Sequence, residues 1–105
     1  MTTNRVLRHV VLFKFKEGTT GEQVQQIEAA FRALPGKINA IHDFEWGTDV
    51  SVEGIADGFT HCFFVTFASE ADRDAYLPHP AHRAFGAGLR PYLAKVLVFD
   101  YWTQS

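Results

Sequence analysis

Four short stretches rich in β-branched and aromatic residues most limit how this chain can fold. They lie at residues 8–15, 41–47, 60–67 and 95–102. Such stretches are typical of β-strands, and turn-forming glycines and prolines lie between them. The sequence therefore predicts a four-stranded sheet, whose topology depends on the segments that join the strands.

Helix start signals follow the first and third stretches. Thr19-x-x-Glu22 and Ser69-x-x-Asp72 have the spacing of N-terminal caps. Apolar residues recur at helical spacing after the first signal until Pro35-Gly36. Both signals therefore predict helices, each of which follows a strand.

A third, shorter helix is expected after Pro78, with His79 as its cap and Pro80 in its first turn, running to about Arg90. The order β-α-β-β-α-α-β predicts one α+β domain over residues 1–105, of the ferredoxin-like βαββαβ kind with an extra short helix. By analogy with that plan, we expect the first and third strands to be parallel neighbours at the centre of the sheet, with the helices on one face.

Both faces of the expected sheet are apolar. Along the first strand Val11 and Phe13 share a face with His9, and Val10 and Leu12 share the other. The third and fourth strands repeat this pattern. Helices on one side leave the second face bare, and a large exposed apolar patch usually marks an interface. We therefore predict a homodimer in which two sheets pack face to face.

The segment YLPHPAHRAFG, residues 76–86, gathers groups able to transfer protons. His82, Phe85 and Leu89 have the i, i+3, i+7 spacing of one helix face, so His82 is expected to point inward among apolar neighbours. An unperturbed histidine titrates near pH 6.5, so His82 is a candidate acid or base at neutral pH. Tyr76 is expected to lie beside it.

Two strand histidines are expected to complete this pocket. With parallel strands, His9 and His61 would lie at the same end and on the same face of the sheet, and Tyr76 would head toward them. Each histidine alone is more typical of a hydrogen-bonded core residue. Together with Tyr76 and His82, the two histidines predict an apolar pocket with a few polar groups at one end. Its expected binding walls are Val11, Phe13, Ile27, Phe31, Phe63 and Phe85.

Composition narrows the function further. A net charge of -2 with scattered basic residues argues against nucleic acid, and no apolar run is long enough to cross a membrane. One cysteine, Cys62, is expected to be a buried small hydrophobe and suits a reducing cytoplasm. His79 and His82 diverge and lack a clear third ligand, so no metal is expected, and no cofactor motif is present.

Five blocks in order resemble the stress-responsive dimeric α/β barrel (Dabb) domains. These blocks are RHVVLFKFKEG, WGTDVS, GFTHCFFVTFAS, YLPHPAHRAF and VLVFDY, and they span nearly the whole chain. The resemblance implies a ferredoxin-like fold and a homodimer whose two sheets form a barrel. In a plant member that closes a poly-β-ketone by an aldol step, the positions matching Tyr76 and His82 are the catalytic pair, and His9 and His61 are matched as well.

Two classes of function remain open. In the first, a cofactor-independent enzyme of the polyketide cyclase or aldol type, His82 removes a proton next to a carbonyl and Tyr76 holds the enolate oxygen. In the second, the protein is a stress-related dimer without catalytic activity. The same pocket holds an apolar metabolite, or its residues only pack against one another. A third and weaker alternative is a cofactor-free monooxygenase with the same barrel fold.

Overall fold

The computed structural model describes residues 5–104 and contains four strands, three α-helices and two 3₁₀ turns. Their order confirms the β-α-β-β-α-α-β plan expected from the sequence. The elements are β1 Leu7–Phe15, α1 Gly21–Arg32, a turn Leu34–Gly36, β2 Asp43–Thr48, β3 His61–Phe67, α2 Glu70–Tyr76, α3 Pro80–Leu89, a turn Arg90–Tyr92 and β4 Leu93–Trp102.

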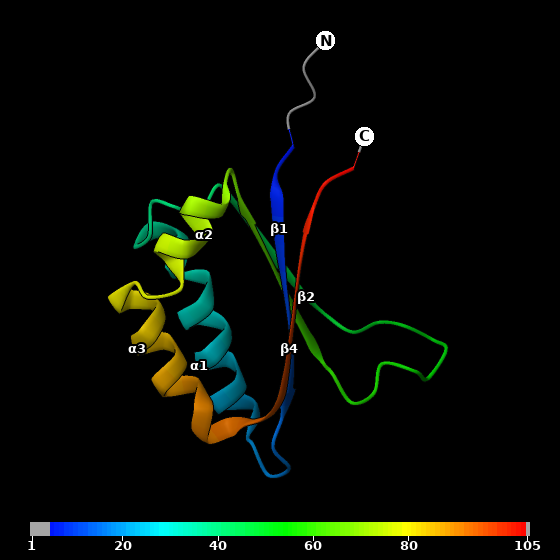
Figure 1. The fold of residues 1–105 in the computed structure, drawn as a ribbon. Coiled ribbons are helices and arrows are strands. Elements are labelled where there is room, and N and C mark those ends of the chain that lie inside the picture. Colours follow the sequence, from blue (N-terminus) through cyan, green and yellow to red (C-terminus); the bar gives the residue numbers. More distant parts are fainter. Residues whose placement is uncertain (1–4, 105) are drawn as a thin grey trace.

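The sheet has the order β2-β3-β1-β4, and all three helices lie on one of its faces (Figure 1). This is a ferredoxin-like α+β fold, as expected. One expectation is wrong: β1 and β3 are central neighbours, but they run antiparallel. The first helix returns the chain so that β2 runs parallel to β1 across one intervening strand. The β2–β3 hairpin then reverses it, which makes β3 antiparallel to β1.

Side-chain caps begin the helices close to where the sequence signals lie. Ser69 accepts the Asp72 N–H at 3.1 Å, and His79 Nδ1 accepts the Ala81 N–H at 3.0 Å, both as expected. The first cap is one residue later than expected. Thr20 forms the capping box with Gln23, while the neighbouring Thr19 hydroxyl donates to the Lys16 carbonyl.

The helices cover the face of β1 and β3 that carries the histidines. Phe31 of α1 stacks on Phe63 of β3 with ring centroids 4.2 Å apart, and Phe13 of β1 packs against both rings. This aromatic cluster fills the centre of the core. The buried apolar residues are Leu7, Val11, Phe13, Ile27, Phe31, Leu34, Ile38, Phe63, Val65, Phe67, Tyr76 and Leu89.

The other sheet face is open and apolar. On β4, Leu97 is 40% exposed, Phe99 61% and Tyr101 39%. Val10 and Leu12 of β1 pair directly with Phe99 and Leu97 and continue the patch toward the centre of the sheet. This set of residues is called the open face below. It is the bare face that the sequence pattern predicts.

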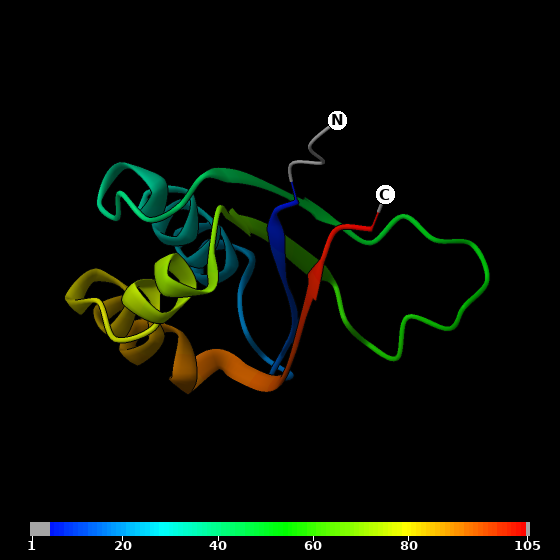
Figure 2. The ribbon, with the colours of Figure 1, turned by 45° about the horizontal axis from the view of Figure 1, so that its top comes forward.

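A long connection between β2 and β3 projects beyond the sheet as an arm (Figure 2). It spans residues 49–60 and exposes Val50, Val52 and Ile55 almost completely. Asp57 and Gly58 have positive φ angles, which turn the chain back toward β3. The arm therefore adds further exposed apolar surface at one end of the sheet.

Candidate functional site

Tyr76 ends α2 with its side chain completely buried. Its ring lies 4.4 Å from the His82 ring and 5.8 Å from the His9 ring, measured between centroids. Within residues 5–104 its hydroxyl has no hydrogen-bond partner. Burial raises the pKa of this phenol well above its ordinary value, so the hydroxyl stays protonated and can only be neutral at physiological pH.

His82 lies in the first turn of α3, and its ring makes one hydrogen bond to the backbone. Its Nδ1–H donates to the Leu77 carbonyl at 2.9 Å, which leaves Nε2 as the nitrogen with a free lone pair. Burial lowers the pKa of the imidazole below 6.5, and the neighbouring His9 and His79 lower it further, against the opposing effect of the Leu77 bond. The ring is therefore neutral at pH 7 and can accept a proton.

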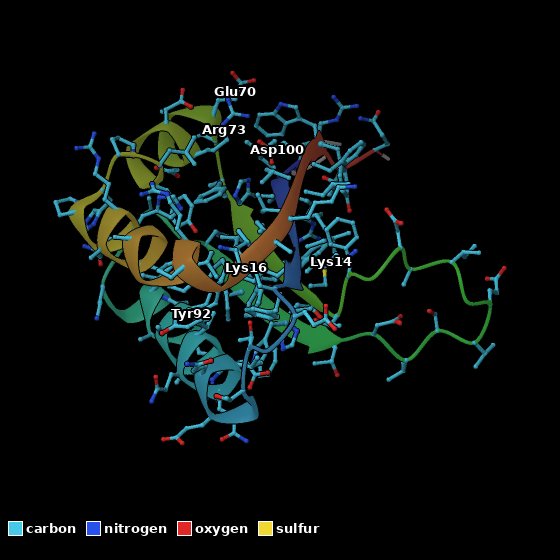
Figure 3. All side chains as sticks on the ribbon, turned by 90° about the horizontal axis from the view of Figure 1, so that it is seen from below. Lys14, Lys16, Glu70, Arg73, Tyr92 and Asp100 are labelled. Carbon is cyan, nitrogen blue, oxygen red and sulfur yellow. The ribbon has the colours of Figure 1, made fainter. Side chains whose placement is uncertain are left out.

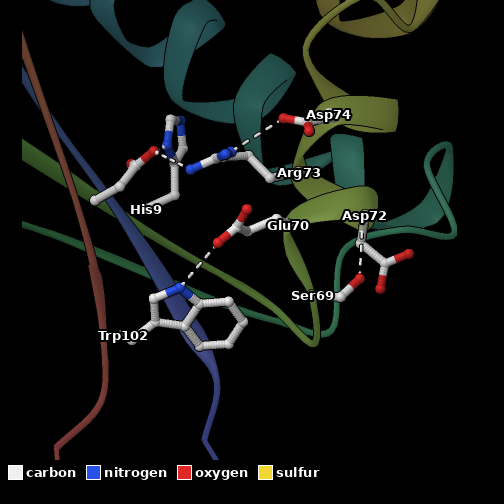
Figure 4. Close-up of polar contacts among 8 residues, drawn as sticks. His9, Ser69, Glu70, Asp72, Arg73, Asp74 and Trp102 are labelled. Carbon is white, nitrogen blue, oxygen red and sulfur yellow. Dashed lines mark hydrogen bonds and ion pairs between the residues drawn. The ribbon is translucent and has the colours of Figure 1, made fainter.

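His9 is buried on β1 and belongs to a polar chain that reaches the surface. Its Nδ1 lies 2.6 Å from Asp100 Oδ1 on β4, and Asp100 Oδ2 lies 3.3 Å from Arg73 Nη1 on α2. Arg73 also contacts Asp74, and Figure 4 shows His9, Arg73 and Asp74 along this chain. Figure 3 places Arg73 beside Asp100. The carboxylate thus fixes the orientation of the His9 ring.

A second contact ties α2 to β4 at the same place. Trp102 Nε1–H donates to Glu70 Oε1 at 3.3 Å, also drawn in Figure 4. Because Glu70 and Arg73 lie one turn apart on α2, the helix is attached to β4 through two side chains. This attachment positions Tyr76 at the end of the helix.

An apolar cavity of about 370 Å³ opens beside these groups, between α3 and β4. This volume lies near the lower end of the range of roughly 300–1,000 Å³ that is usual for small-molecule sites. Tyr76, His82, His9 and Asp100 supply polar atoms at one end. The remaining lining residues are Val11, Phe13, Phe31, Leu77, Phe85, Gly86, Leu89, Arg90, Leu93, Val96 and Val98.

The family model of the stress responsive A/B barrel domain, Dabb, matches residues 7–103 of the chain. The chain belongs to this family. Olivetolic acid cyclase from Cannabis sativa is 36% identical over 90% of this Dabb chain and 94% of the cyclase. The likeness stated from the sequence motifs is thereby confirmed.

Two solved structures support the same assignment. The hydroxynitrile lyase of Passiflora edulis superposes with a TM-score of 0.90 at 31% identity, over 97% of this chain and 96% of the lyase. A ferredoxin-like protein from Thermobifida fusca, described as dimeric and of unknown function, superposes with a TM-score of 0.79 at 27% identity, over 96% and 93% of the two chains.

The Dabb fold brings together most of the residues singled out from the sequence. His9, Tyr76 and His82 meet at one end of the cavity, and Val11, Phe13, Phe31 and Phe85 line its walls. Ile27 and Phe63 do not line it. Phe63 is buried against Phe13 and Phe31, and Ile27 is buried on α1 beside a separate hollow between α1 and α3. Gly86 lines the cavity with open space where a Cβ would stand.

His61 lies apart from this group, which corrects the expectation that it would join His9. In the antiparallel register His61 pairs with Phe13, whereas His9 pairs with Val65, so the two histidines share a face but lie at opposite ends of the strands. His61 Nε2 lies 2.6 Å from Glu28 Oε2, and its Nδ1 lies 2.8 Å from Thr60 Oγ1. These contacts tie α1 to β3.

Sequence reasoning missed the acidic partners of both histidines. Asp100 and Glu28 are 91 and 33 residues away from His9 and His61, so no local motif joins them. One signal was present: Asp100 lies on the same parity of the last strand as Val96 and Val98. A carboxylate on the helix-facing side of a largely apolar strand indicates a buried cationic or hydrogen-bonding partner.

Other kinds of site find no support in the part of the chain that the structure describes. Among residues 5–104, no group of three His, Cys, Asp or Glu side chains could hold a metal ion. Over the same range, no helix has the length and apolar character needed to cross a membrane.

Proposed function

We propose that this Dabb chain is a cofactor-independent acid–base enzyme that acts on a small apolar carbonyl compound. His82 is the base, and Tyr76 is the hydrogen-bond donor to the carbonyl oxygen. The reaction class is formation or cleavage of a carbon–carbon bond next to a carbonyl, of the polyketide cyclase or aldol type.

The buried and unpartnered hydroxyl of Tyr76 carries this proposal. Native proteins leave few buried polar groups without a partner, because such a group costs about 1–3 kcal/mol. This hydroxyl lies in a ring packed directly against His82, at the polar end of an apolar cavity. A substrate oxygen bound in the cavity would supply the missing acceptor.

The proton balance of the proposed step is simple. His82 Nε2 takes a proton from the carbon next to the carbonyl, and the electron pair of that C–H bond moves to the oxygen, which accepts a hydrogen bond from Tyr76. The enolate carbon then attacks a second carbonyl of the same chain, and the new alkoxide takes the proton back from His82. Because the phenol remains protonated, Tyr76 stabilises the oxygen without serving as the base.

Two relatives support a carbonyl reaction. The names of the cyclase and the lyase both denote enzymes, and a base paired with an oxygen-binding donor serves either chemistry. In a lyase reaction of the hydroxynitrile kind, the same base would take the hydroxyl proton as the bond to cyanide breaks. The lyase reaction is therefore the second candidate.

We further propose that two copies pair through the open face to form the barrel. The exposed apolar side chains of β4 and the description of the Thermobifida fusca structure as dimeric support this pairing. Burying this patch against a second sheet removes it from water, which is the usual reason for such a patch.

An assay with linear triketide or tetraketide thioesters, and separately with an aromatic cyanohydrin, tests the function. We expect turnover by the wild type, a loss of roughly 10²–10⁴-fold in His82→Ala, and a comparable loss in Tyr76→Phe. His42→Ala is the matched control, because His42 is exposed and outside the cavity.

Equal turnover rates for the wild type and His82→Ala would contradict the catalytic proposal. Tight binding of apolar ligands without any turnover would favour the alternative, a non-catalytic binding dimer. In that case His82→Phe should keep or raise the melting temperature.

A further inference from the structure

The cavity has different polar groups at its two ends. The register pairs Asp100 with His9, Val98 with Val11 and Val96 with Phe13, so the cavity follows β4 away from the histidine end. At the other end α3 passes into the turn Arg90–Tyr92 at the foot of β4 (Figure 1). Arg90 lines the cavity there.

Arg90 is a cation without a counter-charge. Within residues 5–104, no carboxylate lies within 4.0 Å of its guanidinium, and the group makes no side-chain hydrogen bond. Arg73 pairs with Asp100, and Arg8 donates to Thr66, whereas Arg83 also lacks such a partner. Arg90 differs from Arg83 because it lines the cavity. The one carboxylate that lines the cavity, Asp100, is bound to His9 and Arg73.

The chemistry of an unpaired guanidinium beside apolar walls selects one class of group. Its planar N–H donors match the two oxygens of a carboxylate, and the pairing strengthens where water is partly excluded. Leu89, which is buried, and Leu93 line the same cavity on either side of Arg90 in the chain, while Arg90 itself is exposed to solvent. His82 and Arg90 are eight residues apart, roughly 12 Å along the helix direction.

We propose that Arg90 binds the carboxylate of an apolar ligand whose other end reaches Tyr76 and His82. The preferred substrate class is thus a carbonyl compound with an apolar chain that also bears a carboxylate. The statement about a substrate rests on the proposed function. The carboxylate site itself rests only on the position of Arg90.

Binding of octanoate and octanamide, measured by calorimetry or by NMR titration at pH 7.5, tests the site without any turnover. We expect the wild type to bind octanoate roughly two- to fivefold more tightly than octanamide, because Arg90 is exposed. Arg90→Gln should abolish this preference, and Arg90→Lys should keep part of it. Arg83→Gln is the matched control, since Arg83 lies exposed on the same helix and does not line the cavity.

The outcomes separate this inference from the proposed function. A wild type that binds both ligands equally overturns it, as does a preference that survives in Arg90→Gln but disappears in His82→Ala, because the anion would then lie at the imidazole end. If no carbonyl compound is turned over but the preference still depends on Arg90, the carboxylate site stands and the catalytic proposal fails. Should Arg90→Gln not fold, a smaller preference in Arg90→Lys than in the wild type, with Arg83→Lys unchanged, decides in its favour. An undiminished preference in Arg90→Lys decides against it.

Discussion

Burial keeps both Tyr76 and His82, the two adjacent polar residues of the cavity, in their neutral forms. Tyr76 stays protonated because burial disfavours the phenolate, and His82 stays unprotonated because burial disfavours the imidazolium. The same desolvation therefore prepares a donor and an acceptor side by side. No charged partner is needed for either.

Removing the Tyr76 hydroxyl should separate stability from activity. We expect Tyr76→Phe to leave the free energy of unfolding unchanged or to raise it by up to about 2 kcal/mol, since a buried donor without a partner disappears. Urea unfolding measures this, with Tyr92→Phe at the far end of the helix layer as control. A loss of more than about 1 kcal/mol would mean that the hydroxyl makes a hydrogen bond in the folded protein.

The pH dependence of His82 has a definite sign. Its pKa is below 6.5 in the folded protein, so below about pH 6.5 the unfolded chain binds more protons than the folded one. The contribution of His82 to the free energy of unfolding should therefore decrease as pH falls through that window and stay constant above it. NMR titration of the ring checks the direction, and a pKa above 6.5 would contradict it.

The lowered pKa of His82 also predicts how the catalytic rate depends on pH. If His82 is the base, kcat/KM should rise with pH only below about 6.5 and be flat at neutral pH.

At the scale of elements, α3 forms one wall of the cavity and contains two glycines with room for a side chain. We expect Gly86→Ala and Gly88→Ala each to raise the free energy of unfolding by about 0.5–1 kcal/mol, because alanine is the better helix former. Only Gly86 lines the cavity beside His82, so only Gly86→Ala should weaken ligand binding. Chemical denaturation and octanoate titration of both variants test this; equal ligand affinities would show that the cavity does not extend to Gly86.

The elements themselves were largely predictable because their signals are local. Ser69 and His79 cap the helices expected of them, and the first cap moved by one residue because Thr19 and Thr20 both offer a hydroxyl. The direction of β3 relative to β1 was not predicted correctly, because it depends on how α1 and the β2–β3 hairpin cross the sheet. That single error placed His61 at the wrong end of the face.

The site was predictable to the extent that it depends on parity and helical spacing. These two patterns brought His9 to the correct face and His82 with Phe85 to the cavity. Parity places Asp100 on the helix-facing side of the last strand, but neither pattern identifies its partners. The contacts of Asp100 with His9 and Arg73, and of Glu28 with His61, were therefore missed. The cavity wall formed by Val96 and Val98 was missed for the same reason.

At the scale of the whole molecule, the open face predicts how the chain assembles. Phe99→Asp should convert the proposed dimer to a monomer, because it places a charge in the middle of an apolar contact. Ala87→Asp adds the same charge on the exposed side of α3 and should remain dimeric. Light scattering coupled to size exclusion gives the mass of each, with circular dichroism to confirm folding. A monomeric wild type, or a dimeric Phe99→Asp, would contradict pairing through this face.

One consequence follows from where the cavity lies. Apart from His9, Val11, Phe13 and Phe31, every residue that lines it falls between Tyr76 and Asp100. A single exchange of this stretch between family members would therefore replace eleven of the fifteen lining residues at once, together with Leu97 and Phe99 of the open face, and would leave Phe13, Phe31 and Phe63 of the recipient in place. On the proposed function, such an exchange should transfer the substrate preference of the donor, although it also replaces the core residues Tyr76 and Leu89.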